Sequence, residues 1–485
     1  MSSPTYNLRD RLALAFGRST SWQLLLAGCV AALFGVLAGA VVTFLPVWAG
    51  FVALLALAAA IFFFSSTDYA LAAVLGLAAV LPFGTLPFKA IITPSLLELA
   101  LIGLMAFWIL RLLTNPSETL ILTPLGLPLI GFLGLTMFSF LLGSNMRPDS
   151  LTLHNYFKFL LGITFFFSVV NCIRTRKQAR WMLRALMLAA GLSALIGLGL
   201  YVLPNTLSEQ ILIQFGRIGY PSTGRVLRFI MDDTSGIERA IGLSVDPNSY
   251  GGMLSLVGAI VATQIVAERP ILPRWLLIGM AGLIALVVVL TYSRAALAGL
   301  LVAAAYVATL RYRRLWLAML AAALVLAMLL LGLGVGQEFT TRIIDGLQFR
   351  DQANQMRLAE YRNAIAVIQA YPVFGIGFGA APEIDLVAGV SSIYLAIGQR
   401  TGLLGLSAFV GIMLFFFAQS LTALRAASAA GDDERAAWLV SLQAGVAAAL
   451  TVGVLDHYFF NIEFSHMATL LWGVIGLATI SSSEF

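Results

Sequence analysis

Long, continuous apolar runs constrain the fold of this chain more than any other feature of its sequence. Runs rich in leucine, alanine, valine and phenylalanine follow one another along the chain, separated by shorter polar segments. An α-helix needs about 20 apolar residues to cross the hydrocarbon core of a bilayer. The runs do not alternate between polar and apolar residues, as the strands of a membrane β-barrel would. Charged residues make up only 11% of the chain, against roughly 25% in soluble globular proteins. The sequence therefore predicts a helical integral membrane protein.

The borders between apolar runs and polar segments predict about fourteen transmembrane helices. We expect spans at about 22–42, 45–64, 69–83, 95–113, 125–143, 156–173, 182–203, 242–267, 275–292, 295–310, 315–333, 391–420, 436–456 and 464–480. The runs at 69–83 and 295–310 are short for a full crossing, so about twelve or thirteen spans is the alternative. The first run lacks a small-residue cleavage site, so we expect a retained helix and not a signal peptide. The predicted fold class is an all-α polytopic membrane protein with about 12–14 transmembrane helices.

Basic clusters predict the orientation of these spans. The clusters are Arg9, Arg11 and Arg18, then Arg174, Arg176, Lys177 and Arg180, and then Arg311, Arg313 and Arg314. With fourteen spans all three fall on one side, which the positive-inside rule makes cytoplasmic. The long polar segments 204–241 and 334–390 then lie on the other face, the periplasmic face of a bacterial inner membrane. They separate an N-terminal transmembrane scaffold (1–203), central helices (242–333) and C-terminal helices (391–485).

The composition predicts no metal site, disulfide framework or nucleic-acid partner. Cys29 and Cys172 are the only cysteines, and both lie in or beside apolar runs. The only histidines are His154, His457 and His466, and no two of them have metal-ligand spacing on one loop. The net charge of +6 comes from basic residues between spans, which membrane orientation explains better than nucleic-acid binding. We expect no cofactor.

The segment from Phe339 to Gly405 gathers an unusual number of charges between two spans. Its residues 356–370 have the apolar spacing of an amphipathic helix, with Leu358, Tyr361, Ile365 and Ile368 on one face. Most charges on this helix are expected to be solvated, and Arg357 and Glu360 could lie one turn apart. A glycine run, Tyr371 to Gly379, is expected to bend the backbone because glycine accepts positive φ. Such a loop is suited to cover a membrane cavity.

Three arginines are the main candidates for chemistry. Arg239 precedes Asp246-Pro247-Asn248, which has the residues of a helix N-terminus, and the structural interpretation is favoured for Asp246 and Asn248. A cation beside a helix start favours anion binding, so Asp246 and Asn248 are also substrate-binding candidates, as is Arg217 in the same loop.

Arg294 lies beside an apolar run, where it either reaches the interface or faces an internal cavity. The guanidinium groups of Arg239, Arg294 and Arg357 would then lie on one membrane face. Guanidinium groups match phosphate oxygens in geometry and charge. A lipid-linked pyrophosphate would be a fitting ligand, and its departure could be stabilised without a metal.

A further polar group lies between the last two predicted spans. It comprises Asp456, His457, Glu463 and His466. One of these histidines could act as a base. Hydrogen-bonded histidines are common where helices end, so the structural interpretation is favoured over a chemical one.

These residues together resemble the O-antigen ligase and Wzy-type polysaccharide polymerase superfamily. The resemblance rests on four segments in order: Arg239-x-x-Gly-x-x-x-Asp-Pro-Asn248, Leu290-Thr-x-Ser-Arg294-Ala, Arg357 before Tyr371-Pro-x-x-Gly-Ile-Gly-Phe-Gly379, and Tyr394-Leu followed by Gly402-Leu-Leu-Gly-Leu406. It covers about residues 235–410. The resemblance implies a metal-independent membrane glycosyltransferase that resembles the GT-C class and uses a glycan on undecaprenyl pyrophosphate. The arginines at positions 239 and 294 would hold the pyrophosphate, and Arg357 would assist.

One departure from the family pattern bears on the reaction. The ligases usually have His-Asn-x-Tyr-Leu where this chain has Ser391-Ser-Ile-Tyr394-Leu. A serine hydroxyl is a poor general base at neutral pH. Either a carboxylate replaces the histidine or leaving-group stabilisation suffices. The candidate carboxylates are Glu383, which we favour, and Asp385, Glu360 and Asp351. Ser391 and Tyr394 are expected to line the substrate site.

The missing histidine favours a polysaccharide polymerase that transfers an undecaprenyl-pyrophosphate-linked glycan to a lipid-linked repeat unit. The first alternative is an O-antigen ligase that transfers the glycan to lipid A core. An alternative of another class is a transporter or flippase of a lipid-linked glycan, although transporter sites usually lie at mid-membrane. Expected partners are the lipid-linked oligosaccharide and membrane lipid, and a chain-length regulator and a flippase would be compatible with this function.

Overall fold

The computed structural model describes residues 58–86, 93–143, 148–230, 233–332, 352–378 and 390–482, together with the single helical residues 28, 32 and 35. The first two predicted spans lie largely outside these residues, and so does most of the predicted periplasmic loop 334–390.

From residue 67 onward, every predicted span coincides with a helix. These helices are α4 (Thr67–Val80), α5 (Leu96–Thr114), α6 (Gly126–Gly143), α7 (Ser150–Cys172), α8 (Arg176–Val202), α10 (Pro247–Ile265), α11 (Arg274–Leu290), α12 (Arg294–Leu310), α13 (Arg314–Gly332), α16 (Ile393–Ala429), α17 (Asp433–Leu455) and α18 (Ser465–Ser482). The largest difference is in α16, which continues past the predicted end at residue 420. The amphipathic helix predicted at 356–370 is α15 (Gln352–Ala370).

Six of the described helices are long and apolar enough to cross a membrane, namely α5, α6, α7, α8, α16 and α17. Helices α4, α11 and α12 and the described part of α13 are apolar but shorter. Almost all other regular structure is helical, and the only paired strands among the described residues are β1 (Arg228–Phe229) and β2 (Glu238–Arg239). The chain is therefore an all-α polytopic membrane protein, as the apolar runs predicted.

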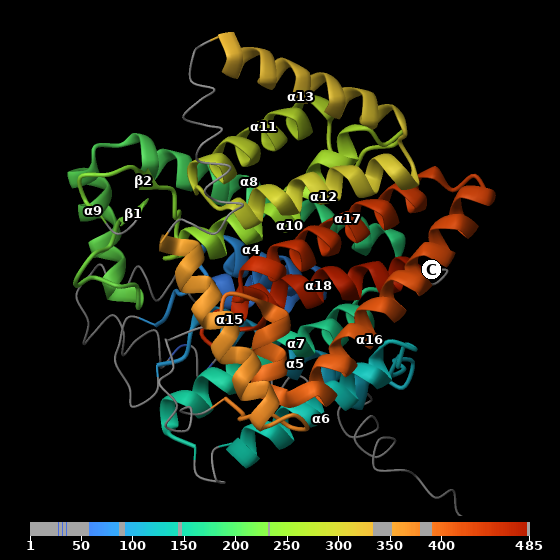
Figure 1. Ribbon diagram of the computed structural model, residues 1–485. Coiled ribbons are helices and arrows are strands. Elements are labelled where there is room, and N and C mark those ends of the chain that lie inside the picture. Colours follow the sequence, from blue (N-terminus) through green and yellow to red (C-terminus); the bar gives the residue numbers. More distant parts are fainter. Residues whose placement is uncertain are drawn as a thin grey trace, which may run out of the picture.

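Helices α17 and α18 cross the middle of the bundle (Figure 1). Helix α18 packs along α7, and α17 packs along both α10 and α12. Residues 435–449 of α17 are buried on every side of the helix, as expected for a helix without a polar face. Small residues allow close approach: Ser255 of α10 donates its hydroxyl to the carbonyl of Ala296 in α12 at 3.0 Å. Helix α13 lies at the edge of the molecule (Figure 1).

The two ends of the bundle differ in chemistry. At one end, which we call the arginine-rich end, α8 and α12 reach the acidic turn before α17. Arg176 pairs with Asp432 at 2.6 Å, Arg180 with Glu434 at 2.5 Å and Arg311 with Asp433 at 2.5 Å. Two of the predicted basic clusters therefore lie at the same end, as the orientation prediction required. The other end, where α10, α12, α16 and α18 begin, we call the site end.

The first polar loop is more structured than the sequence predicted. It contains α9 (Asn205–Gln214), the 3₁₀ helix η1 (Phe215–Ile218) and the β1–β2 hairpin, which lie together at one side of the molecule (Figure 1). Arg228 of β1 is opposite Arg239 of β2. A second 3₁₀ helix, η3 (Tyr458–Phe460), follows α17.

Helix α16 is broken at Gly402, whose φ of 67° and ψ of −173° are accessible essentially to glycine alone. The backbone groups that the break frees are bonded by residues 371–378, which we call the glycine strap. The bonds are Leu403 N–H to Pro372 C=O (2.7 Å), Leu404 N–H to Val373 C=O (3.5 Å), Ile376 N–H to Gln399 C=O (2.9 Å) and Gly377 N–H to Arg400 C=O (2.9 Å). Unpaired backbone groups are costly inside a membrane, so the strap and the break stabilise each other.

Helix α6 completes this junction from the opposite side. The Ser139 hydroxyl contacts the carbonyls of Phe374 (2.7 Å) and Arg400 (2.5 Å), one on the strap and one on α16. Gly375 and Gly377 have φ of 67° and 73°, which agrees with the predicted glycine bend. A Cβ atom on Gly377 would lie 2.5 Å from the Ser139 carbonyl. The glycines therefore allow the strap to fit between α6 and α16.

Candidate functional site

Arg239 is held at the site end by two fixed acceptors. Its Nε donates to the carbonyl of Thr291 at 2.8 Å, and its Nη2 donates to Asn248 Oδ1 at 2.6 Å. These bonds join β2 to the α11–α12 turn and to the first turn of α10. Burial lowers the pKa of Arg239, and the nearby carboxylates Asp246 and Asp456 oppose that shift. Arginine stays protonated at neutral pH, so the site contains a fixed cation of set orientation.

The start of α10 places a carboxylate beside Arg239. Asp246 caps the helix by accepting the backbone N–H groups of Asn248 and Ser249, each at 2.8 Å, and Pro247 occupies the first helical turn. This is the helix N-terminus that the sequence predicted. Asn248 has a second role because its side-chain oxygen orients Arg239. In the site, Asp246 therefore caps α10 and Asn248 orients Arg239.

The backbone around Arg239 departs from ordinary geometry at two positions. Val245, just before the cap, has φ of 65°, and Tyr292, in the α11–α12 turn, has φ of 52°. Positive φ is rare for residues other than glycine and costs of order 1–3 kcal/mol. Tyr292 follows Thr291, whose carbonyl binds Arg239, and Val245 precedes the helix cap Asp246. Backbone strain of this kind is common in functional sites.

Arg357 of α15 faces Asp456, the residue that ends α17. Its Nη2 lies 3.7 Å from Asp456 Oδ1, and the Asp456 side chain is only 4% exposed. Asp456 Oδ2 has no hydrogen-bond partner among the described residues. A buried carboxylate oxygen without a partner is costly, and a ligand hydroxyl at this point would satisfy it.

Burial determines the acidity of Asp456. It raises the pKa of this carboxyl from 3.8 to about 7, and it outweighs Arg357, whose positive charge lowers the pKa. Asp246 raises the pKa further by repulsion, whereas Arg239 lowers it. A carboxyl with a pKa near the working pH is suited to accept and release a proton.

The other charge of α15 predicted to lie near Arg357 points elsewhere. Glu360 is 9% exposed and accepts the backbone N–H of Ser391 at 2.9 Å. Glu360 is therefore an exception to the expectation that most charges on this helix are solvated, and it lies one turn from Arg357 as predicted. The predicted apolar face is also displaced, because Ile365 is 47% exposed while Ala364 and Val367 are fully buried. Tertiary packing of α15 against α16 selects the face that contains Glu360.

Ser391 and Tyr394 lie beside this contact. The Tyr361 hydroxyl donates to the carbonyl of Ser391 at 2.9 Å, so that α15 holds the backbone of Ser391 from two sides. The Tyr394 hydroxyl donates to the Leu450 carbonyl at 3.0 Å. Tyr394 therefore joins α16 to α17, and Ser391 lies at the start of α16 close to the carboxylate of Glu360.

His457 and Tyr458 follow Asp456 and extend the group. Their rings stack with centroids 4.7 Å apart. Burial lowers the pKa of His457, so its imidazole is neutral at pH 7, and its Nδ1 has no partner among the described residues. Burial also raises the pKa of the Tyr458 phenol, and Asp246 adds to this shift. We call the following residues the polar cluster: Arg239, Asp246, Arg357, Glu360, Asp456, His457 and Tyr458.

The structure brings some predicted site residues into the polar cluster and leaves others apart. Arg294 is the first residue of α12, three positions after the Thr291 carbonyl that binds Arg239, and its side chain is exposed. Arg217 lies in η1 and is exposed, and among the described residues no hydrogen bond or ion pair joins it to the polar cluster. Glu383, Asp385 and Asp351 lie outside the described residues.

The residue that sequence reasoning undervalued is Asp456. The only signal was its position, an acidic side chain at the end of an apolar span, for which a structural role was favoured. Its partner Arg357 comes from α15, far earlier in the chain, so the pairing could not be read from local spacing.

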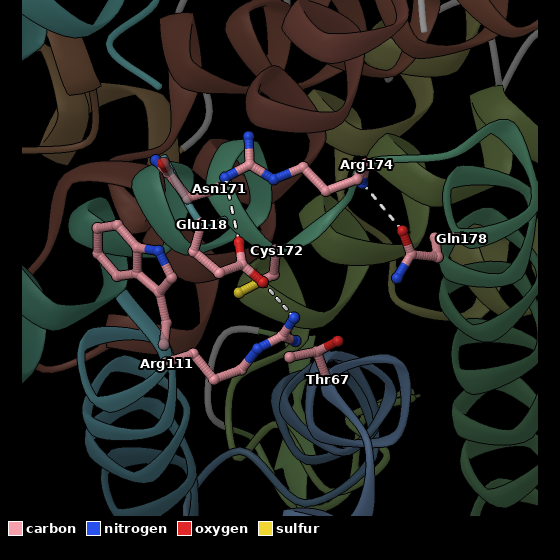
Figure 2. A pocket seen from close by; sticks show the side chains of 8 residues that line it. Thr67, Arg111, Glu118, Asn171, Cys172, Arg174 and Gln178 are labelled. Atoms are coloured by element: carbon pink, nitrogen blue, oxygen red, sulfur yellow. Dashed lines mark hydrogen bonds and ion pairs between the residues drawn. The ribbon is translucent and has the colours of Figure 1, made fainter. Parts of the chain in front are cut away.

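A cavity at the arginine-rich end has no connection to this chemistry. Figure 2 shows Arg111 and Arg174 on either side of Glu118 in a cavity of about 170 Å³. Asn171 donates to the Ile121 carbonyl at 3.1 Å and accepts the Ile121 N–H at 2.7 Å. These contacts fasten the segment between α5 and α6 to α7 and α8, so the cavity is a structural junction.

The polar cluster thus combines two arginines with one proton-accepting carboxyl, drawn from β2, the start of α10, α15 and the end of α17. Among the described residues, no three His, Cys, Asp or Glu side chains are grouped so that they could hold a metal. Such a site can stabilise a departing anion and accept a proton from an attacking hydroxyl.

Comparison with known families identifies the segment that carries part of this site. Residues 279–410 match the family described as O-antigen ligase, which confirms the resemblance found in the sequence. The matched range contains Arg294, Arg357, the glycine strap, Ser391 and Tyr394, whereas Arg239 and Asp456 flank it. No curated protein matches the chain significantly.

Proposed function

Starting from a polytopic membrane protein with an O-antigen ligase domain, we propose that this chain is a polysaccharide polymerase. It transfers a glycan from undecaprenyl pyrophosphate to a lipid-linked repeat unit, on the periplasmic face of a bacterial inner membrane. The family match supports a glycosyltransferase of the ligase and polymerase type. The observation that carries the proposal is the approach of Arg357 to Asp456 within the polar cluster that also contains Arg239.

In this reaction the guanidinium groups act on the leaving group. Arg239, with Arg294 and Arg357, binds the pyrophosphate and stabilises the charge that grows on it as the glycosidic bond to the carrier breaks. Arg239 is already oriented by Asn248 and the Thr291 carbonyl, so little reorganisation is needed. The residues assigned to this step are arginines, and no metal takes part in it.

Asp456 acts on the acceptor. Its Oδ2, which has no hydrogen-bond partner among the described residues, accepts the proton of the acceptor hydroxyl as that oxygen attacks the anomeric carbon. This assigns to Asp456 the role of the histidine that the family has where this chain has Ser391. Glu360 is the other candidate carboxylate among the described residues. It already accepts the Ser391 N–H, which favours a positioning role for it.

The ligase remains the second candidate because the matching family is described as O-antigen ligase. A gel comparison of polysaccharide and lipopolysaccharide from a strain that lacks the protein separates the two. Loss of long polymer, with single repeat units still reaching a carrier or lipid A, supports the polymerase. Long glycan accumulating on undecaprenyl pyrophosphate beside bare lipid A core would refute it in favour of the ligase.

The same strain tests the assigned arginine. Complementation with Arg294→Ala is expected to leave long polymer absent, although the protein inserts and purifies. Arg425→Ala is the matched control. Arg425 is an exposed arginine near the end of α16 that lies at the arginine-rich end, away from the polar cluster. Normal chain lengths with Arg294→Ala would remove Arg294 from the mechanism.

A further inference from the structure

A second cavity lies at the arginine-rich end, between α12 and α13. It has a volume of about 710 Å³, and its lining includes Arg311, Tyr312, Arg313 and Arg314, the turn that joins the two helices. Val266 at the end of α10 and Ala318 of α13 add apolar wall. The cavity is several times larger than the one in Figure 2, and it is far from the polar cluster because it lies at the opposite ends of α10 and α12.

The arginines of this cavity have different roles. Arg311 is fixed, because it pairs with Asp433 at 2.5 Å and donates to the Ser428 hydroxyl at 3.1 Å. Arg313 and Arg314 are exposed, and neither forms an ion pair with another described residue. Asp433 and Glu268, whose negative charges both act on the lining residue Tyr312, oppose the three arginines, so these groups leave one excess positive charge at the cavity. The start of α13 adds the positive end of a helix dipole.

The surface next to the cavity is apolar and open. Leu317, Leu320 and Leu324 of α13 are 70%, 57% and 57% exposed, and Trp316 is 48% exposed. Tryptophan is enriched at the membrane interface, where its ring lies at the level of the headgroups. Helix α13 is at the edge of the molecule (Figure 1), so lipid chains can reach these leucines. A cationic cavity therefore continues into an apolar helix face.

We propose that this cavity binds the phosphodiester headgroup of an anionic phospholipid, with Arg313 and Arg314 on the phosphate and the acyl chains along α13. Basic pockets between helices at a membrane surface favour such headgroups. Phosphatidylglycerol carries one negative charge and two acyl chains, so it matches both the excess charge of the cavity and the exposed leucines. The inference is independent of the reaction proposed for the polar cluster.

The test uses the full chain, purified in detergent and depleted of lipid. Binding of phosphatidylglycerol, phosphatidylethanolamine and inorganic phosphate is measured separately by native mass spectrometry and by the shift in thermal unfolding. We expect phosphatidylglycerol to bind more tightly than the zwitterionic lipid, and inorganic phosphate to give no shift at the same concentration. Equal binding of both lipids would overturn the proposal, and an equal shift with phosphate would reassign the cavity to a soluble anion.

Substitutions of the cavity arginines test where the lipid binds. Each arginine near the membrane surface contributes about 1 kcal/mol to binding an anionic lipid, so Arg313→Gln with Arg314→Gln should weaken phosphatidylglycerol binding about thirtyfold. The control is Lys177→Gln with Arg425→Gln, which removes two exposed cations at the same end but outside the cavity. Equal losses in both double variants would show non-specific attraction and refute the site.

Discussion

Replacing Asp456 by asparagine tests whether this carboxyl takes part in catalysis or only in the stability of the fold. In the folded protein the pKa of Asp456 is about 7, against an ordinary value of 3.8. A difference of about 3 pH units corresponds to about 4 kcal/mol at 1.36 kcal/mol per unit. Because the folded-state pKa is raised, the folded protein binds the proton more tightly than the unfolded chain. The free energy of unfolding should therefore fall as the pH rises from about 4 to about 7 and stay low above that.

Asparagine cannot ionise and removes this penalty. At pH 8, Asp456→Asn is expected to be as stable as the wild type or more stable, with a gain of up to about 4 kcal/mol in the free energy of unfolding. The gain at pH 5 should be smaller. The transfer rate should nevertheless fall by about 10²- to 10⁴-fold, the usual contribution of a general base. In the wild type, kcat/KM should rise about tenfold per pH unit below pH 7 and level off above it.

The assay is transfer of a labelled, lipid-linked oligosaccharide by the purified full-length protein, combined with thermal unfolding at both pH values. Asp233→Asn is the control, because Asp233 is an exposed aspartate in the first polar loop at the site end. Retained activity in Asp456→Asn would refute the assignment. An inactive variant that is also much less stable at pH 8 would show that Asp456 is needed as a charged partner of Arg357.

Further predictions concern the arginine, the helix break and the replaced histidine. Arg239→Lys keeps the charge but loses the guanidinium fork that bonds the Thr291 carbonyl and Asn248 from two nitrogens. Transfer should therefore fall about 10²- to 10³-fold with little change in KM for the acceptor, and unchanged kcat would contradict the role in leaving-group stabilisation. Gly402→Ala forces a side chain into a backbone conformation reserved for glycine and against the Val373 carbonyl, so thermal unfolding should show a loss of at least about 3 kcal/mol. Gly411→Ala in the same helix, where nothing lies within 4 Å, should be nearly neutral, and equal losses in the two would refute the explanation. Ser391→His should change polymer transfer by less than about tenfold if a carboxylate is the base, whereas a large rise in transfer to lipid A core would show an altered ligase site.

Much of the fold could be predicted because membrane helices leave a local signal. Apolar runs gave every span from residue 67 onward, and Asp246-Pro247 marked the start of α10. The pairing of Arg239 with Asn248 was within reach because both belong to one short motif.

What could not be predicted depends on contacts between distant segments. Asp456 meets Arg357 only after α15 packs at the end of α17, and Glu360 is buried because Ser391 offers it a backbone N–H. Helical periodicity suggested the wrong face for α15, since that face is selected by α16 and not by the apolar residues alone. The glycine strap and the break in α16 are joined by backbone hydrogen bonds. The pattern of side chains in the sequence does not predict such bonds.

The strap and the Ser391 contact have a consequence for how substitutions act around α16. The backbone bonds of Ile376 and Gly377 fasten the strap to α16, whereas Glu360 and Tyr361 of α15 hold the backbone of Ser391. The two sets of contacts share no residue, so a substitution that loosens one set does not remove the other.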